Sequence, residues 1–361
     1  MSEPEPSGPL AAQYDVALLD LDGVVYLGGV AVAGATEALA GIARHGLRRV
    51  FVTNNASRTA RAVAAQLVDL GVPAGAEDIV TSAQAAAGRL AELLPRDAQV
   101  LVVGGEGLIE AVRERGLTPV FSADDDPAAV VQGFSATTTW QMLMEACVSV
   151  RSGRHWVVTN SDATLPTPRG EGPGNGALVD VVRRTTGREP DEVAGKPFAP
   201  IMVEALRRRP AGRPLVVGDR LDTDIEAAHA AGMDSMLVLT GVTGVTGLLE
   251  CPPQRRPTYV AADLSGLLDP GHRPSARDGW WCCGDAAFRL RGDGAAGVDV
   301  DLTVGGERVE RRAAPLDARA AADLVHAAAA ARWSWPDADG DVTARCRDAL
   351  APWAAPHGWD R

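Results

Sequence analysis

Lysine is almost missing from this chain of 361 residues, because Lys196 is the only one among 35 basic residues. Acidic residues number 47, and the net charge of −12 argues against binding to nucleic acid, which depends on neutralising phosphates. Aromatic residues make up only 4%, so aliphatic side chains must form most of the core. The five cysteines form no CxxC pattern, which favours free thiols in a reducing compartment.

Long apolar runs and a leader-like N-terminus are also absent. No stretch of about 18 uncharged apolar residues occurs. The polar start MSEPEPSGPLAAQ has no basic segment followed by an apolar one. We therefore expect a cytoplasmic protein without membrane insertion.

Strand-like segments alternate with helical patterns near residues 15–70 and again near 201–239. This alternation, with a late strand candidate at 235–239, predicts βαβ units in a Rossmann-like parallel-sheet α/β core. The long region between the two stretches has strand candidates of its own at 100–103, 129–131 and 155–158. Segments rich in Pro, Gly and Arg precede a C-terminal part that holds six of the eight tryptophans. The expected parts are a disordered tail at 1–13, a core at 14–83 and 190–268, an inserted α/β domain at 84–189, a linker at 269–279, and a small α+β domain with its own core at 280–361.

Two aspartates directly follow the predicted strand at residues 15–19, in the segment Asp20-Leu21-Asp22-Gly23. Side chains two residues apart leave a strand on the same face, so both carboxylates are expected at the edge of the sheet where α/β folds bind ligands. Like charges this close need a cation, and oxygen ligands favour Mg²⁺. The alternative is a simple turn, since Asp and Gly favour turns.

Polar residues follow two other predicted strands. Thr53-Asn54-Asn55 offers a hydroxyl, amides and backbone N–H groups, which suit either an anion site or an ordinary helix cap. Asp219 and Asp224 lie about one helical turn apart after the strand at 215–217, where they suit either a metal or the start of a helix. Lys196 offers a compact point charge that arginine cannot imitate, although an accidental lysine on a loop is the alternative.

The motifs DLDGVVY, FVTNN, GKP and GDRLDTD occur in this order, with a long insert after the second. Over about residues 14–268 this arrangement resembles the haloacid dehalogenase superfamily of phosphatases with a large cap, the cap being the inserted domain. The resemblance implies Mg²⁺-dependent hydrolysis of small phosphate monoesters, with Asp20 as the nucleophile that becomes phosphorylated and Asp22 as the general acid and base. It assigns the phosphoryl group to Thr53, Asn54, Asn55 and Lys196, and Mg²⁺ to Asp20, the backbone carbonyl of Asp22 and Asp219, with support from Asp224.

The segment Asn160–Pro166 resembles the family's substrate-specificity loop. Asp162 in this loop either binds a substrate hydroxyl or caps the loop locally. The loop has no aromatic or basic side chain, which favours a small polyol phosphate as substrate.

The C-terminal part makes the whole chain resemble the actinobacterial glycerol 3-phosphate phosphatases, whose tail is similar to a fragment of an N-acetyltransferase. Residues 289–295 match an acetyl-CoA loop pattern, but a predicted strand follows where that loop should open a helix. We therefore expect a structural or homodimer-forming role for this part. The resemblance implies glycerol 3-phosphate as substrate. The alternatives are a phosphatase for sugar, nucleotide or pyridoxal phosphates, a phosphotransferase, and an acyl-CoA-binding module.

Overall fold

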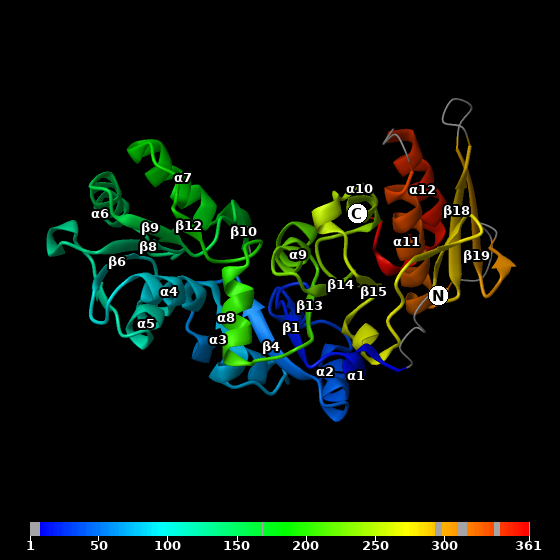
Figure 1. The fold of residues 1–361 in the computed structure, drawn as a ribbon, viewed down its shortest axis with the longest axis horizontal. Coiled ribbons are helices and arrows are strands. Elements are labelled where there is room, and N and C mark those ends of the chain that lie inside the picture. The colour runs from blue at the N-terminus through cyan, green and yellow to red at the C-terminus, as the bar shows by residue number, and fades with distance from the viewer. Residues whose placement is uncertain (1–7, 168, 293–297, 310–315, 336–339, 361) are drawn as a thin grey trace. The chain divides into compact units, whose positions relative to one another are not determined.

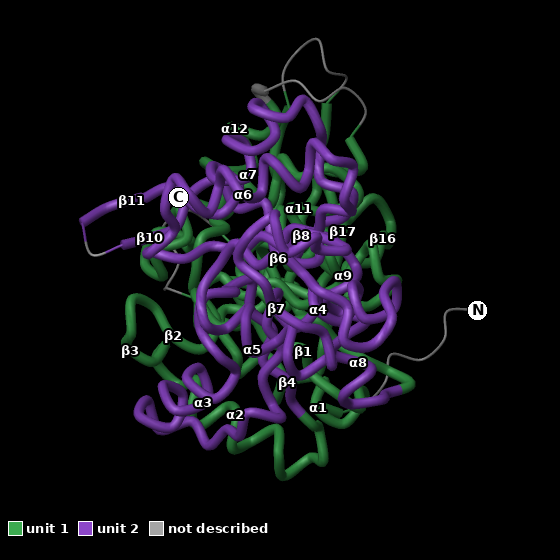
Figure 2. Tube along the Cα trace, turned by 90° about the vertical axis from the view of Figure 1, so that its left-hand side faces the viewer, with its two compact units in different colours: residues 1–48, 212–361 green, residues 49–211 purple. Residues whose placement is uncertain are grey.

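The computed structural model describes residues 8–167, 169–292, 298–309, 316–335 and 340–360. Two compact units divide the chain (Figure 2): the first comprises residues 1–48 and 212–361, and the second residues 49–211. Residues 49–83 and 190–211, expected in the core, share the second unit with the insert. The boundaries proposed for the core and the inserted domain stay a prediction.

Parallel strands in the order β15-β14-β13-β1 form the sheet of the first unit (Figure 1). Leu19 lies opposite Val217, and Val217 opposite Met236, so neighbouring strands end at the same edge. The strands predicted near residues 15–19, 215–217 and 235–239 are confirmed. The bounds of the elements are β1 Val16–Leu19, β2 Tyr26–Leu27, β3 Val30–Ala31, β13 Pro214–Gly218, β14 Asp234–Val238, β15 Tyr259–Ala261, α1 Leu10–Gln13, α2 Ala35–Arg44, the π-helical turn Leu221–Ile225, α9 Glu226–Ala230 and α10 Val245–Glu250.

Part of the segment that was expected to be a disordered tail is folded. Leu10–Gln13 form the helical turn α1, in which Leu10 and Ala11 are buried, and the Leu10 N–H donates to the Asp269 carbonyl at 2.9 Å. The expectation of a disordered tail is therefore wrong for these residues, because the apolar side chains are covered. Residues 1–7 lie outside the described residues.

Parallel strands also dominate the second unit. β4 pairs with β5, and a separate five-stranded sheet has the order β12-β9-β8-β6-β7. The predicted strands at 100–103, 129–131 and 155–158 are confirmed, and their buried residues surround Trp156. The bounds are β4 Arg48–Thr53, β5 Ile79–Thr81, β6 Gln99–Val103, β7 Thr118–Val120, β8 Ala129–Gln132, β9 His155–Val158, β10 Thr164–Thr167, β11 Gly170–Pro173, β12 Glu192–Val193, α3 Ala60–Asp69, α4 Ser82–Leu93, α5 Glu106–Glu114, α6 Trp140–Arg151, α7 Asn175–Thr186 and α8 Pro200–Arg208.

The C-terminal part is α+β, as predicted. Its antiparallel sheet has the order β16-β17-β18-β19-β20, and helices α11 and α12 pack beside it (Figure 1). The residues expected to be a linker include strand β16, which pairs with β17, so that expectation is wrong for residues 275–277. The bounds are β16 Ser275–Arg277, β17 Trp280–Cys283, β18 Ala286–Arg291, β19 Asp299–Val304, β20 Glu307–Arg308, α11 Ala318–Trp333 and α12 Gly340–Ala354.

A separate core for the C-terminal part was expected, and this expectation is wrong. One hydrophobic cluster includes Leu237 and Leu248 as well as Phe288, Leu324 and Trp353. The apolar faces of α11 and α12 are therefore covered partly by the sheet β16–β20 and partly by α10 and β15. The resemblance to an N-acetyltransferase stays a prediction, and residues 293–295 of the candidate acetyl-CoA loop lie outside the described residues.

All five cysteines are free thiols, as expected. Among the helices of the described residues, none is long and apolar enough to cross a membrane.

Candidate active site

Three carboxylates meet beyond the ends of β1 and β13. Oxygen atoms of Asp20, Asp219 and Asp224 all lie within 4.8 Å of one another. Asp219 and Asp224 are each only 1% exposed, whereas Asp20 is half-buried. The parallel pairing of β1 with β13 places Asp20 and Asp219 at the same sheet edge, as the sequence predicted.

The Asp219 carboxylate is fitted closely into its surroundings. Its Oδ2 accepts a hydrogen bond of 2.6 Å from the Val242 N–H. A Cβ atom added at Gly23 would lie 2.4 Å from this oxygen, and one added at Gly241 would lie 1.9 Å from it. Gly23 also has a positive φ of 82°, which other residues rarely adopt. Both glycines are therefore required by the position of one carboxylate.

Asp224 is oriented by the π-helical turn that follows β13. Its Oδ2 accepts a hydrogen bond of 3.1 Å from the Arg220 N–H, and a Cβ at Gly218 would lie 2.1 Å from the Asp224 Cβ. This close approach turns the Asp224 side chain back toward the strand end. Arg220 itself pairs with Asp222, so its guanidinium is directed to a carboxylate outside the acidic cluster.

The acidic cluster fits a hard divalent cation. Like charges at this separation and burial are costly unless a cation compensates them. A donor set made only of carboxylate oxygens suits Mg²⁺ better than a soft metal. The chemistry of the residues therefore agrees with the predicted magnesium site.

Asp22 stands apart from the acidic cluster. It is exposed, and its Oδ2 accepts a hydrogen bond of 3.4 Å from the Tyr26 hydroxyl. The three clustered carboxylates do not include that of Asp22. The metal contact predicted for Asp22 is made by its backbone carbonyl, and this contact stays a prediction. The Asp22 carboxyl is exposed and therefore accessible for proton transfer.

In the second unit, Asn54 connects two other predicted site residues, Lys196 and Asp162. Its Oδ1 accepts from the Lys196 N–H at 2.8 Å, and its Nδ2 donates to the Lys196 carbonyl at 3.0 Å. The same Nδ2 lies 3.2 Å from Asp162 Oδ2. The structure thus brings together the end of β4, the lysine turn and the loop predicted to select the substrate.

Lys196 is buried, with 3% of its surface exposed. Its Nζ donates to the Val52 carbonyl at 3.3 Å. The preceding Gly195 allows this approach, because a Cβ there would lie 2.6 Å from Asn54 Oδ1. A lysine on a solvated loop is therefore excluded.

Thr53 and Asn55 lie beside Asn54 but make local contacts. The Asn55 N–H donates to Thr53 Oγ1 at 3.1 Å. Asn55 Oδ1 accepts from the backbone N–H groups of Ser57 and Arg58 at 3.0 and 3.2 Å. These contacts hold the turn after β4, and a phosphoryl contact from Asn55 stays a prediction.

Sequence reasoning missed three residues that fix the position of Asn54 and its neighbours. The Asn54 carbonyl accepts from Ser82 Oγ at 2.6 Å and from Asn160 Nδ2 at 2.8 Å. Asn175 Nδ2 in turn donates to the Asn160 carbonyl at 2.7 Å. Asn160 belongs to the loop that the resemblance singled out, and Asn175 is the first residue of α7, but nothing in their spacing predicts these contacts.

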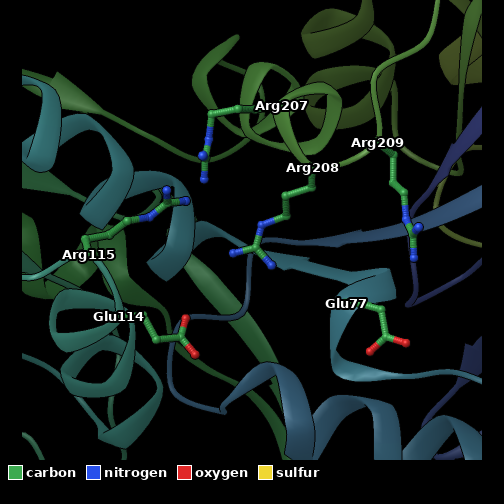
Figure 3. A pocket seen from close by; sticks show the side chains of 6 residues that line it. All are labelled: Glu77, Glu114, Arg115, Arg207, Arg208 and Arg209. Carbon is green, nitrogen blue, oxygen red and sulfur yellow. The ribbon is translucent and has the colours of Figure 1, made fainter.

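A pocket of about 470 Å³ elsewhere in the second unit contains none of the predicted site residues (Figure 3). It is lined by Glu77, Glu114, Arg115, Arg207, Arg208 and Arg209. Arg115, Arg207 and Arg208 all pair with the buried Glu204. Burial raises the pKa of Glu204, but hydrogen bonds from Arg207 and Arg208 outweigh it and hold the pKa below its ordinary value. We interpret this arginine group as a structural ion cluster at the end of α8.

Comparison with known proteins agrees with this fold. Residues 17–118 match the haloacid dehalogenase-like hydrolase family, and residues 193–267 match a second model described as HAD-hydrolase-like. The chain belongs to the haloacid dehalogenase-like hydrolase family.

Relatives of the chain include a D-glycerol 3-phosphate phosphatase of Mycobacterium tuberculosis, 43% identical over 92% of this chain and 98% of the relative. A 5'-nucleotidase of Bacillus subtilis is 39% identical over 70% of this chain and 96% of its own length. The crystal structure of a glycerol phosphate phosphatase from M. tuberculosis in complex with magnesium has a TM-score of 0.81 and 41% identity, covering 96% of this chain and 99% of that chain. The p-nitrophenyl phosphatase from Archaeoglobus fulgidus has a TM-score of 0.66 and 31% identity, covering 71% and 98%.

Proposed function

We propose that this protein is a Mg²⁺-dependent phosphatase that hydrolyses glycerol 3-phosphate to glycerol and phosphate. The observation that carries the proposal is the acidic cluster of Asp20, Asp219 and Asp224 at the ends of parallel strands. The substrate is supported by the mycobacterial D-glycerol 3-phosphate phosphatase, which matches 92% of the chain. The nucleotidase relative matches only 70% of it.

In the proposed reaction, an Asp20 carboxylate oxygen attacks phosphorus, and the bond between phosphorus and the glycerol oxygen breaks. Asp22 protonates the leaving oxygen, and it then takes a proton from the water that attacks the aspartyl-phosphate. Phosphate leaves and the Asp20 carboxylate is restored. The exposed position of the Asp22 carboxyl supports its role in exchanging protons.

Mg²⁺ bound by Asp20, the Asp22 carbonyl and Asp219 would neutralise the charge on the transferred phosphoryl group. Asp224 would hold the arrangement of these ligands. Thr53, Asn54, Asn55 and Lys196 would bind the phosphoryl oxygens, with Lys196 adding a point charge. Asn54 holds the Lys196 backbone, and the Val52 carbonyl holds its Nζ, which supports this role because a fixed charge costs no reorganisation during the reaction.

Asp162 is the proposed selector of the substrate hydroxyls, and its contact with Asn54 supports this role. Asp162→Asn should raise KM for glycerol 3-phosphate with a smaller change in kcat. Asp180→Asn serves as the matched control, because Asp180 pairs with Arg183 on α7. An unchanged KM, with only a lower melting temperature, would mean that Asp162 is a local cap.

A substrate panel tests the proposed activity. We expect kcat/KM for glycerol 3-phosphate to exceed the values for sugar phosphates, nucleoside monophosphates and pyridoxal phosphate. A preference for another ester would overturn glycerol 3-phosphate as the proposed substrate but would leave the proposed phosphatase mechanism intact. Transfer of labelled phosphate to a sugar, with no release of free phosphate, would show that the protein is a phosphotransferase. Binding of acetyl-CoA in a calorimetric titration, with no phosphate release from any ester, would show that it is an acyl-CoA-binding module.

We further propose that the protein acts on its small phosphorylated substrate in the cytoplasm, without nucleic acid and as a homodimer. The net charge of −12 and the free cysteines support the location and the absence of nucleic acid. Sedimentation of the purified protein measures the oligomeric state.

A further inference from the structure

The loop between β14 and α10, residues 239–244, contacts the acidic cluster directly. The Val242 N–H donates to Asp219 Oδ2 at 2.6 Å, and the Thr243 N–H donates to the Asp219 carbonyl at 3.2 Å. Thr240 Oγ1 donates to the Gly23 carbonyl at 2.5 Å, one residue after Asp22. This β14–α10 loop therefore fixes both the side chain and the backbone of Asp219.

The other end of the loop is joined to the end of the chain. Val245, the first residue of α10, donates its N–H to the Trp359 carbonyl at 2.8 Å. Without this acceptor, the N–H at the start of the helix would have to find water. Trp359 is thus connected to the Asp219 carboxylate through its hydrogen bond with Val245, the short segment 242–245, and the hydrogen bond from Val242 to Asp219.

Trp359 is held in a defined position. Gly358 has a positive φ of 72°, which turns the chain back after α12, and the Trp359 N–H donates to the Ala354 carbonyl at 3.0 Å. The Trp359 side chain is 4% exposed and stacks on His357 with ring centroids 4.6 Å apart. Trp359 is therefore a fixed anchor for the loop.

Helix α10 is also held by the C-terminal part along its length. Leu248 and Leu249 belong to the same hydrophobic cluster as Trp353 and Trp359, and Trp333 Nε1 donates to the Leu248 carbonyl at 3.0 Å. α10 has only six residues, too few to be stable without packing. The C-terminal part supplies much of that packing.

We propose that the C-terminal part orients the metal site, with Trp359 as a positioning residue that holds the β14–α10 loop against Asp219. This inference rests on the proposed role of Asp219 as a Mg²⁺ ligand. A purely structural role for the C-terminal part predicts lower stability with unchanged Mg²⁺ affinity. A positioning role predicts weaker Mg²⁺ binding in a protein that stays folded.

The test compares two truncations of the full chain by calorimetric titration with Mg²⁺ in the absence of substrate. Deletion of residues 359–361 removes the acceptor for Val245, whereas deletion of residues 360–361 keeps it. We expect the longer deletion to weaken Mg²⁺ binding about 10-fold, because losing a group that orients a metal ligand lowers metal affinity by about this factor or more. The shorter deletion should bind like the wild type.

Two tryptophan variants separate positioning from stability. Trp359→Ala and Trp353→Ala each remove a buried indole from the same hydrophobic cluster, and Trp353 makes no hydrogen bond to the loop in the described part of the chain. We expect weaker Mg²⁺ binding only in Trp359→Ala, with partial recovery in Trp359→Phe. Equal Mg²⁺ affinity in the wild type and the longer deletion would overturn the inference, as would equal weakening in both Ala variants.

Asp219→Asn identifies a failure of the underlying function. If the wild type and Asp219→Asn bind Mg²⁺ equally, Asp219 is no ligand, and both the proposed metal site and the inference are overturned. If Asp219→Asn loses binding while the longer deletion keeps it, only the positioning role is wrong.

Discussion

Lys196 illustrates, at the scale of single residues, how burial restricts the choice between two cations. Its stem is enclosed, its Nζ donates to the Val52 carbonyl, and its backbone is held by both polar atoms of Asn54. A guanidinium is a broad planar fork and would need more room than an ammonium. The lysine therefore belongs to a site that matches its shape as well as its charge.

Lys196→Arg should lower kcat by about 100-fold, because the fork cannot occupy the position of the point charge and a stabilising donor is lost. Steady-state phosphate release measures this. The control Arg61→Lys makes the reverse exchange between arginine and lysine at an exposed position, where no change in kcat is expected. A kcat near that of the wild type in Lys196→Arg would contradict the role given to this lysine.

At the scale of elements, the sequence predicts strands better than the contacts of the loops that follow them. The buried strands and the aspartates after β1 and β13 follow from apolar runs and motif spacing. The contacts among Asn54, Asn160 and Asn175 depend on how separate loops pack, so no local pattern encodes them. For the same reason the sequence could not show that Val242, in the β14–α10 loop, bonds Asp219, or that Val245, directly after the loop, bonds Trp359.

Gly241 tests the fit of the β14–α10 loop to the Asp219 carboxylate. Gly241→Ala places a Cβ 1.9 Å from Asp219 Oδ2 unless the loop moves, so Mg²⁺ affinity should fall about 10-fold or more. Calorimetric titration with Mg²⁺ measures the change. Gly247→Ala on α10 is the control, because its nearest neighbour would be an ordinary 3.8 Å away. Unchanged affinity in Gly241→Ala would show that the loop does not constrain Asp219.

Glu204 on α8 should stabilise the fold at neutral pH. Removing one partner of a buried ion pair costs about 3 kcal/mol, so Glu204→Gln should lower the free energy of unfolding by about that amount. Urea unfolding at pH 7 measures the loss. Glu77→Gln, on the exposed side of the same pocket, should change stability by less than about 0.5 kcal/mol.

The pH dependence of this contribution follows from the pKa of Glu204, which folding lowers from its ordinary 4.5. A carboxyl with a lowered pKa stabilises the fold above its unfolded pKa, and this contribution is lost as the pH falls through the folded pKa. The difference in unfolding free energy between the wild type and Glu204→Gln should therefore be full at pH 7 and shrink below about pH 4.5. A difference that grows on acidification would contradict the role of the arginines.

At the scale of the whole molecule, the C-terminal part and the α/β core of the first unit share one hydrophobic cluster. Composition suggested a separate domain, because tryptophans concentrate there and Pro-rich segments precede it. The shared cluster forms because α10 and β15 present apolar faces that α11 and α12 cover. The mycobacterial D-glycerol 3-phosphate phosphatase matches almost the whole chain, including most of this part.

The central claim is that Asp20 and Mg²⁺ together carry out phosphate ester hydrolysis. Its most direct test is the rate of phosphate release from glycerol 3-phosphate by the wild type with Mg²⁺, by the wild type with EDTA, and by Asp20→Asn with Mg²⁺. We predict turnover in the first case only, restored after EDTA by excess Mg²⁺, with the melting temperature of Asp20→Asn showing that it is folded. Turnover by Asp20→Asn near the wild-type rate, or undiminished turnover in EDTA, would contradict the account.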